Sequence, residues 1–222
     1  MSRIALIHAL EQSVLPTRRA FAALWPEATI FDLLDTSLSA DHAHIGVLDA
    51  AMMGRFASLG AYARGTSGLG GRTSAILFTC SAFGPAIEEV KARLDVPVLR
   101  PNEAAFEHAL ARGNRIGLVV TFPPSLAPLR AELEAMAEAR HQQISIEPRI
   151  APGALAALSA GHEAEHDRLI AEASRDLDVD VIILGQFSMA RAQQAVAALN
   201  PALVLTTPDS AVEKLRQMLA VR

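Results

Sequence analysis

The sequence predicts an α/β protein with parallel sheets, built as two pseudo-symmetric halves. Short runs of β-branched residues and leucine alternate with segments of helical period. Several runs are apolar almost throughout, as strands are when both faces of a sheet are covered. Strands that alternate with helices favour parallel sheets with right-handed crossovers. A repeat along the chain, described below, divides the pattern into two related parts.

The expected elements follow from these runs in chain order. Strands are predicted at 3–8, 28–33, 74–79, 96–99, 115–120, 143–147, 180–184 and 202–205. Segments rich in Ala, Leu, Glu and Arg lie between them and predict helices. These helices are expected at 14–24, 48–63, 84–94, 102–112, 125–140, 163–177, 189–198 and 209–220.

Three segments recur in the same order and at nearly constant spacing. Residues 4–16 recur as 116–128, residues 75–80 as 181–186, and the helix start Pro101–Asn102 as Pro208–Asp209. Asn and Asp are both good helix N-caps. The repeat predicts a first half made of 1–100 plus 205–222 and a second half made of 101–204. If the halves face one another, we expect a cleft for a small ligand between them.

Composition excludes several classes of protein. A hydrophobic fraction of 51% with 20% charged residues argues for a folded core and against disorder. A net charge of −4 offers no electrostatic attraction for nucleic acid. The apolar runs are of strand length, and we therefore expect neither a signal peptide nor a membrane-spanning segment. With one unpaired cysteine, we expect a protein of the reducing cytoplasm.

Cys80 is the only cysteine, and it stands at the end of an apolar strand. Strand ends that open onto helix N-termini are where α/β proteins commonly bind ligands. The N–H groups and the positive dipole end of the following helix are expected to favour its thiolate. The alternative is a buried structural cysteine. Gln186, its counterpart in the repeat, favours the functional interpretation, because both strand ends would face the same cleft.

The sequence resembles the aspartate/glutamate/hydantoin racemase superfamily, which includes maleate isomerases and arylmalonate decarboxylases. The resemblance rests on Phe78–Gly84, Thr121–Ser125, Gly161–Ile170 and Asp180–Met189, and it spans nearly the whole chain. It implies two flavodoxin-like halves, with the C-terminal helix returning to the first. It also implies catalysis without metal or organic cofactor on a small carboxylate of the amino acid, hydantoin or dicarboxylate type. Homodimers are frequent in this family, so a homodimer is an expected assembly.

The racemases of this family carry two cysteines that flank the substrate carbon, and the second would fall at Gln186. A carboxamide neither takes nor gives a proton near neutral pH. Because two-base racemization needs an acid and a base on opposite faces of the carbanion, simple amino-acid racemization is not expected. One thiol still suffices for adding to an unsaturated dicarboxylate and leaving again after bond rotation. It also suffices for protonating a carbanion left by decarboxylation. A binding protein that has lost the chemistry is the third alternative.

Negative charge on a substrate carboxylate or enolate must be stabilised by hydrogen-bond donors, which we expect near these strand ends. The resemblance places backbone N–H groups there at Ser81–Ala82 and Phe187–Ser188. The candidate substrate-binding residues are His8, Ser81, Ala82, Thr121, Ser125, Gln186, Phe187 and Ser188. For His8, at the end of the first strand, the alternative is a histidine whose hydrogen bonds are satisfied inside the fold.

Three further motifs admit a ligand-binding interpretation that their context disfavours. The segment His162–His166 matches the H-E-x-x-H pattern of zinc sites, but it lies at the start of an amphipathic helix. There His166 is expected to lie over the core, and acidic residues in the first turn interact favourably with the helix dipole. The glycine-rich segment 65–71 follows a helix and precedes a strand, which is the reverse of a phosphate loop, so we expect a flexible connection. His42 and His44 lie in a segment that is expected to be a polar loop. No metal site is therefore predicted.

Overall fold

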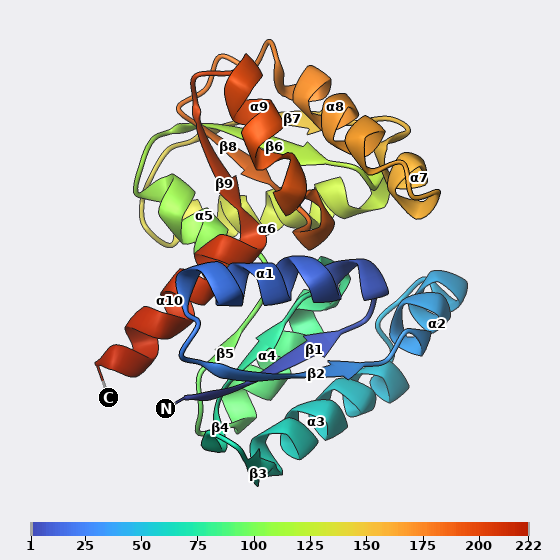
Figure 1. Cartoon of the computed structure of the whole chain (residues 1–222), viewed down its shortest axis with the longest axis vertical. Coiled ribbons are helices and arrows are strands. Elements are labelled where there is room, and N and C mark those ends of the chain that lie inside the picture. The colour runs from blue at the N-terminus through green and yellow to red at the C-terminus, as the bar shows by residue number, and fades with distance from the viewer. Residues whose placement is uncertain (1, 222) are drawn as a thin grey trace. The chain divides into compact units, whose positions relative to one another are not determined.

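The computed structural model describes residues 2–221, and these form two compact units (Figure 1). Unit 1 comprises Met1–Pro101 and Ala211–Arg222, and unit 2 comprises Asn102–Ser210. Each unit is an α/β sandwich with its own sheet. No helix within 2–221 is long and apolar enough to cross a membrane.

The sheet of unit 1 has four parallel strands in the order β2-β1-β4-β5. A short strand, β3, pairs antiparallel with the start of β4. The strands are β1 (Arg3–His8), β2 (Thr29–Leu34), β3 (Ser67–Gly68), β4 (Gly71–Phe78) and β5 (Val98–Leu99). The central strands β1 and β4 are buried on both faces, which explains their continuous apolar sequence.

Helices cover both faces of this sheet (Figure 1). They are α1 (Val14–Leu24), α2 (Ser37–Ile45), α3 (Ala50–Gly65), α4 (Gly84–Arg93) and α10 (Thr207–Ala220). On one face, side chains of α2, α3 and α4 form a core with alternate residues of β1 and β4, among them Ile7 and Phe78. Phe56 of α3 stacks on Phe78 with a centroid separation of 5.5 Å. On the other face, α10 is joined to α1 by Arg216, which donates to the Leu24 carbonyl at 2.8 Å.

Unit 2 repeats this design with four parallel strands in the order β7-β6-β8-β9. These are β6 (Arg115–Val120), β7 (Ser145–Ile150), β8 (Val181–Leu184) and β9 (Leu203–Thr206). Its helices are α5 (Glu103–Leu110), α6 (Leu126–Glu138), α7 (Ala154–Ser159), α8 (Glu163–Ser174) and α9 (Gln193–Leu199). One core lies between the sheet and helices α5 and α6, and a second lies between the sheet and helices α7 to α9.

The strand order and register confirm the fold class and show the internal repeat. In both units the first parallel strand lies between the second and third parallel strands, which is the order of a flavodoxin-like sheet. Ile4 is paired with Ala75 in unit 1, and Ile116 is paired with Val181 in unit 2. The recurring sequence segments therefore occupy equivalent strands.

Short 3-10 turns follow corresponding strands in the two units. They are η1 (Glu11–Ser13), η2 (Ser81–Phe83), η3 (Pro123–Ser125) and η4 (Phe187–Ala192). Ser13 donates to the Leu10 carbonyl at 2.7 Å, and Ser125 donates to the Phe122 carbonyl at the same distance. The repeat thus extends to the turn that follows the first strand of each unit.

Three segments differ from the sequence prediction. The expected polar loop around His42 and His44 is the helix α2, which ends at Gly46, a residue with φ of +80°. Only Leu38 of this helix is buried, so the segment lacks the apolar periodicity by which helices are recognised. The expected flexible connection at 65–71 contains the β3–β4 hairpin, and helix α7 was not predicted.

Candidate active site

Cys80 lies two residues beyond the end of β4 and is the extended residue that precedes turn η2, with φ −119° and ψ 121°. Gln186 holds the equivalent place after β8 and before turn η4, with φ −133° and ψ 144°. Cys80 is partly buried and packs against the core of unit 1. Strand β4 and its turn thus place the thiol at the carboxyl end of the sheet, where parallel α/β folds bind ligands.

The backbone N–H of Ala82 and the hydroxyl of Ser39 both act to lower the pKa of the Cys80 thiol. Both groups favour the thiolate. Burial nevertheless outweighs them and raises the pKa of Cys80 above its ordinary value of 9.0. The expectation that the following turn and helix make Cys80 a thiolate is therefore wrong, because desolvation of the charge has the larger effect on the pKa.

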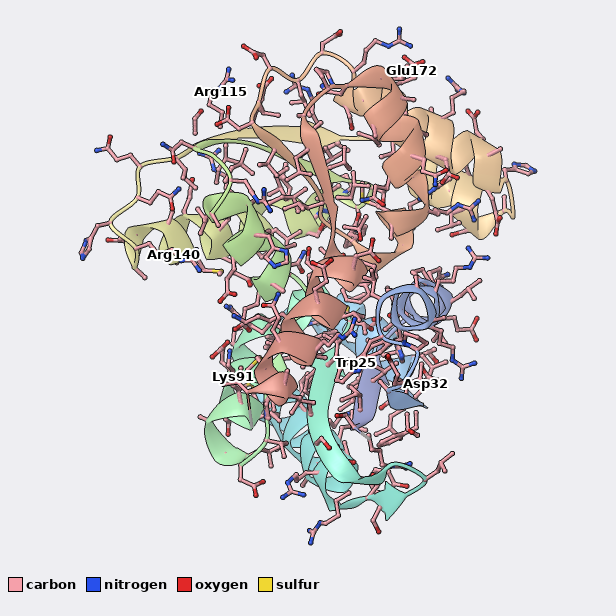
Figure 2. The ribbon with its side chains drawn as sticks, turned by 60° about the vertical axis from the view of Figure 1, so that its left-hand side comes forward. Trp25, Asp32, Lys91, Arg115, Arg140 and Glu172 are labelled. Atoms are coloured by element: carbon pink, nitrogen blue, oxygen red, sulfur yellow. The ribbon has the colours of Figure 1, made fainter. Side chains whose placement is uncertain are left out.

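His8 ends β1 and is fully buried. Its Nε2 lies 3.0 Å from the carboxylate of Asp32, which Figure 2 labels, and its Nδ1 lies 2.9 Å from the hydroxyls of both Ser13 and Thr79. Because a carboxylate only accepts, Nε2 carries the proton of the neutral ring and Nδ1 accepts from a hydroxyl. Arg18 holds the other oxygen of Asp32. The geometry favours the alternative of a histidine satisfied inside the fold, adjacent to the strand that carries Cys80.

Acid is expected to destabilise unit 1 through His8. Burial lowers the pKa of His8 below its ordinary value of 6.5, although Asp32 opposes this shift. The unfolded chain therefore binds this proton at a higher pH than the folded chain does. The contribution of neutral His8 to the free energy of unfolding is complete above about pH 6.5. It is lost as the pH falls through the lowered pKa of His8, at up to about 1.4 kcal/mol per pH unit.

Urea unfolding between pH 5 and 8 measures this effect through the fluorescence of Trp25, the only tryptophan, which is buried in unit 1. A His8→Asn variant should lose part of the pH dependence below 6.5. His44→Asn, which removes an exposed histidine from α2, should keep the wild-type slope. Equal slopes in wild type and His8→Asn would refute the assignment to His8.

In unit 2, the ends of β6 and β8 are joined by Thr121 and Gln186. The carboxamide Oε1 of Gln186 accepts from the Thr121 backbone N–H at 2.7 Å and from the Thr121 hydroxyl at 2.8 Å. Among residues 2–221 no partner is recorded for its Nε2. The side chain is therefore oriented by its oxygen, and its NH₂ group is the end that remains able to donate. The two residues were predicted separately as substrate-binding residues, and the structure brings them together.

The other predicted residues differ in exposure. Ser81 and Ser188 are partly exposed, and Ala82 is exposed. The Ser125 hydroxyl is used within its own turn. Phe187 is 3% exposed, so its side chain belongs to the core and only its backbone N–H remains a candidate for binding a substrate.

Two residues near these strand ends were not recognised as part of the site. Ser39 acts to lower the pKa of Cys80, and it lies on α2, a helix that the sequence analysis did not predict. Asn102 was predicted as an N-cap, but its side chain makes no capping bond to α5. Its Nδ2 instead donates to the Gly185 carbonyl at 2.8 Å, next to Gln186. No sequence pattern signals either role, since both depend on tertiary packing.

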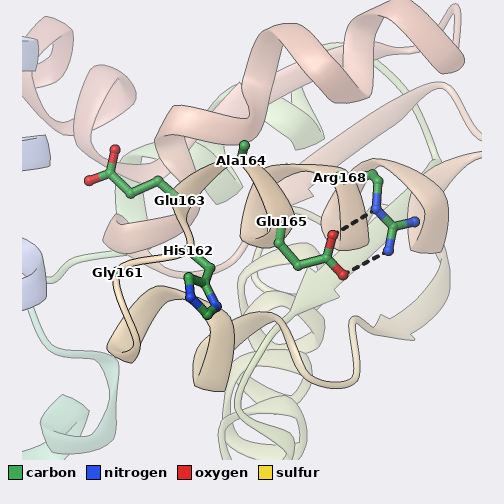
Figure 3. A pocket seen from close by; sticks show the side chains of 6 residues that line it. All are labelled: Gly161, His162, Glu163, Ala164, Glu165 and Arg168. Atoms are coloured by element: carbon green, nitrogen blue, oxygen red, sulfur yellow. Dashed lines mark hydrogen bonds and ion pairs between the residues drawn. The ribbon is translucent and has the colours of Figure 1, made fainter.

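The H-E-x-x-H segment lines an open surface hollow of about 630 Å³ (Figure 3). Its two histidines have different environments: His162 precedes helix α8, whereas His166 is fully buried with its Nδ1 2.9 Å from Asp167. Glu163 is paired with Arg191 of turn η4 at 2.7 Å, and Glu165 is paired with Arg168. These contacts agree with the interpretation of His166 as a boundary residue over the core.

Comparison of the fold with solved structures finds racemases. An allantoin racemase from Klebsiella pneumoniae has a TM-score of 0.70 at 18% identity, covering 100% of this chain and 89% of that chain. A glutamate racemase from Bacillus anthracis has a TM-score of 0.72 at 12% identity, and the match covers 99% of this chain and 82% of that chain. A putative Asp/Glu racemase from Yersinia pestis has a TM-score of 0.68 at 14% identity and covers 100% of both chains. At these identities the likeness shows the fold alone.

The sequence comparisons decide the family. A search of curated proteins gave no match. Residues 44–215 match the family described as Asp/Glu/Hydantoin racemase, and this range includes Cys80, Thr121 and Gln186 as well as most of both units. The chain therefore belongs to the Asp/Glu/Hydantoin racemase family.

Proposed function

We propose that this protein is an isomerase-type enzyme that acts on a small carboxylate through the single thiol of Cys80, without an organic cofactor or metal. The observation that carries the proposal is the placement of the only thiol just beyond the end of β4, at the residue that precedes turn η2. Membership of the racemase family supports an isomerase. Similar structures are named as racemases of allantoin and of glutamate, which favours a substrate of the amino acid, hydantoin or dicarboxylate type.

The proposed chemistry needs one sulfur atom. On an unsaturated dicarboxylate, the thiol of Cys80 first loses its proton to water. The resulting thiolate adds to one carbon of the double bond, and the electron pair of that bond moves onto the adjacent carboxylate. The remaining single bond rotates, the electron pair returns, and the thiolate leaves, so that the other geometric isomer is released. We propose that the charge on the substrate is bound by the N–H groups of Ser81 and Ala82, and by Thr121, Ser125, Gln186 and the Phe187–Ser188 turn.

Gln186 restricts the choice of reaction. Its carboxamide donates or accepts hydrogen bonds but does not transfer a proton near neutral pH. Two-base racemization would require a second proton-transferring group, and Gln186 occupies the place of the family's second cysteine. We therefore propose that Gln186 binds the substrate through its NH₂ group, while Thr121 holds its oxygen.

A second candidate is a lyase in which Cys80 donates a proton. Burial raises the pKa of the thiol, so that it is protonated at neutral pH and ready to donate. After a carboxylate leaves as carbon dioxide, the electron pair on the α-carbon takes the proton from Sγ, and the thiolate recovers a proton from water. The raised pKa favours this candidate over one that requires a resting thiolate.

Incubation with a substrate panel in D₂O, followed by NMR, distinguishes these reactions. The panel contains aspartate, glutamate, 5-substituted hydantoins, maleate and 2-arylmalonates, and Cys80→Ala serves as the control. A new isomer, or deuterium in recovered substrate, supports the isomerase. Loss of carbon dioxide with deuterium in the product supports the lyase. If compounds bind but none is converted, the protein is a binding protein and the enzymatic proposal fails.

A further inference from the structure

The hydroxyl of Thr79 connects the residue before Cys80 to a buried hydrogen-bond network. Thr79 is 5% exposed, and its Oγ1 lies 2.9 Å from Nδ1 of His8 and 2.9 Å from the hydroxyl of Ser13. Its backbone N–H donates to the Ile7 carbonyl at 3.1 Å. Thr79 is therefore held through both its backbone and its side chain, at the point where the chain leaves β4 for Cys80.

The directions of these hydrogen bonds link Thr79 to His8. The Ser13 hydroxyl donates to the Leu10 carbonyl at 2.7 Å, so the Thr79 hydroxyl is the donor left for Nδ1 of neutral His8. The Nε2 of His8 donates to Asp32 at 3.0 Å. Because a buried acceptor without a donor costs free energy, His8 and Thr79 hold one another in place.

The network continues from His8 to the surface of unit 1. Asp32 of β2 accepts from His8 with one carboxylate oxygen, and its other oxygen accepts from Nε of Arg18 at 2.8 Å. The Arg18 side chain, on α1, is 58% exposed, whereas His8 is fully buried. Contacts thus run without a break from a solvent-exposed guanidinium to Thr79, the residue that precedes the thiol.

Unit 2 has no polar side chain at the equivalent positions. The repeat and the strand register place the counterparts of His8, Asp32 and Thr79 at Val120, Pro148 and Gly185. The sandwich of unit 2 therefore forms without such a network, so the fold alone does not require it. Burying polar and charged side chains costs free energy that apolar side chains do not cost. The unit that keeps the network is the one whose strand end carries the thiol.

We propose that His8 is a positioning residue that acts through Thr79 to hold Cys80 in the place from which its sulfur reacts. Residues 79 and 80 share a planar peptide unit, so a fixed Thr79 restricts the backbone of Cys80. The inference rests on the proposed function, because it assumes a reaction at the sulfur. It deepens that proposal by assigning the group that fixes the sulfur, since a misplacement of about 1 Å can lower a rate about 10²-fold.

Alkylation of Cys80 by iodoacetamide tests this role without any substrate. Thr79→Val keeps the shape of the side chain and removes its hydroxyl, so His8 loses its donor. The segment that carries Cys80 should then open more often, and alkylation at neutral pH should be at least about fivefold faster than in wild type. Turnover of a substrate that the panel identifies should fall at least about tenfold. Thr79→Ser retains the hydroxyl and should restore both wild-type rates.

Two variants of His8 separate its two ring nitrogens. Asparagine reaches about as far as Nδ1, so His8→Asn keeps an acceptor for Thr79 and should alkylate at a rate close to that of wild type. Glutamine reaches about as far as Nε2, so His8→Gln keeps a donor for Asp32 but loses the bond to Thr79, and it should alkylate as fast as Thr79→Val. The double variant of His8→Gln and Thr79→Val should be no faster than either single variant, because the two side chains act as one unit.

Thr73→Val is the matched control. Thr73 is also a buried threonine of β4, at 2% exposure, and its hydroxyl bonds to that of Thr66 at 2.8 Å. This variant should leave alkylation and turnover unchanged, even if it lowers the free energy of unfolding as much as Thr79→Val does.

Four results would overturn the proposal. The first is alkylation in Thr79→Val that is no faster than in wild type, and the second is faster alkylation with unchanged turnover. The third is an equal change in Thr79→Ser or in Thr73→Val, which indicates lost packing or lost stability. The fourth is additive changes in the double variant, which indicate that His8 does not act through Thr79. Failure of the proposed function is a separate result, because in that case Cys80→Ala would retain activity whatever the alkylation rates show.

Discussion

Replacing Cys80 with serine is expected to reduce turnover at least about 10³-fold on whichever substrate the panel identifies. Serine is close to cysteine in size and keeps a polar hydrogen at the same place. Its hydroxyl, however, is a far weaker acid than a thiol and a poor nucleophile without an adjacent base. The Michaelis constant should change little, because the carboxylate-binding groups remain. Steady-state kinetics of the purified variant give both values.

Ser74→Ala is the matched control, since Ser74 lies in the same strand β4 and donates only to the Arg72 carbonyl at 3.3 Å. It should retain wild-type activity. If Cys80→Ser lost less than about tenfold while its fold was preserved, the thiol would not take part in the chemistry. A loss confined to the Michaelis constant would assign Cys80 to binding.

Replacing Asn200 with alanine is expected to lower the free energy of unfolding by about 3 kcal/mol. This side chain is 3% exposed and follows helix α9. Its Nδ2 donates to the carbonyls of Ser174 and Leu177 at 2.9 Å, and its Oδ1 accepts from the Ala202 N–H at 2.9 Å. Alanine would remove this donor from the buried Leu177 carbonyl and this acceptor from the partly buried Ala202 N–H, and would leave the Ser174 carbonyl with only a long bond from the Leu177 N–H, at 3.4 Å.

Urea denaturation followed by circular dichroism measures this loss. Asn114→Ala is the control, because Asn114 is exposed and its Oδ1 accepts only from Gln142, at 2.8 Å. It should cost less than about 0.5 kcal/mol. Equal losses in the two variants would show that the carbonyls next to Asn200 find other partners, or that their burial does not matter.

The strands and most helices could be predicted because burial imposes a visible pattern on their sequences. The strands β4 and β8 are buried on both faces, so that residues 75–78 and 181–184 are all apolar. The repeat was visible for a related reason, since equivalent strands have similar surroundings in the two units. The sequence analysis did not predict helix α2, because Leu38 is its only buried residue and it therefore shows no apolar periodicity. Its position depends instead on ion pairs with Arg55, which lies on another helix.

The candidate site was predictable in its residues and less so in its contacts. Cys80, Thr121 and Gln186 stand at the carboxyl ends of predicted strands, where parallel sheets concentrate their ligand-binding groups. The bond between Thr121 and Gln186 follows from the pairing of β6 with β8, which needs the strand order. The bond from the Ser39 hydroxyl to the Ala9 carbonyl depends on the position of α2. To predict the direction of the pKa shift at Cys80, one must know how the effect of burial compares with that of the Ala82 N–H and the Ser39 hydroxyl. No sequence pattern indicates how far a single sulfur atom is buried.

Because Cys80 is the only cysteine, a thiol reagent tests the central claim directly. Wild-type protein is treated with iodoacetamide for increasing times, the extent of modification is read by intact mass, and the labelled residue is confirmed by peptide mapping. If Cys80 carries the reaction, the remaining activity will equal the fraction of unmodified Cys80 at every time point. A fully alkylated protein that retains its activity would contradict the account.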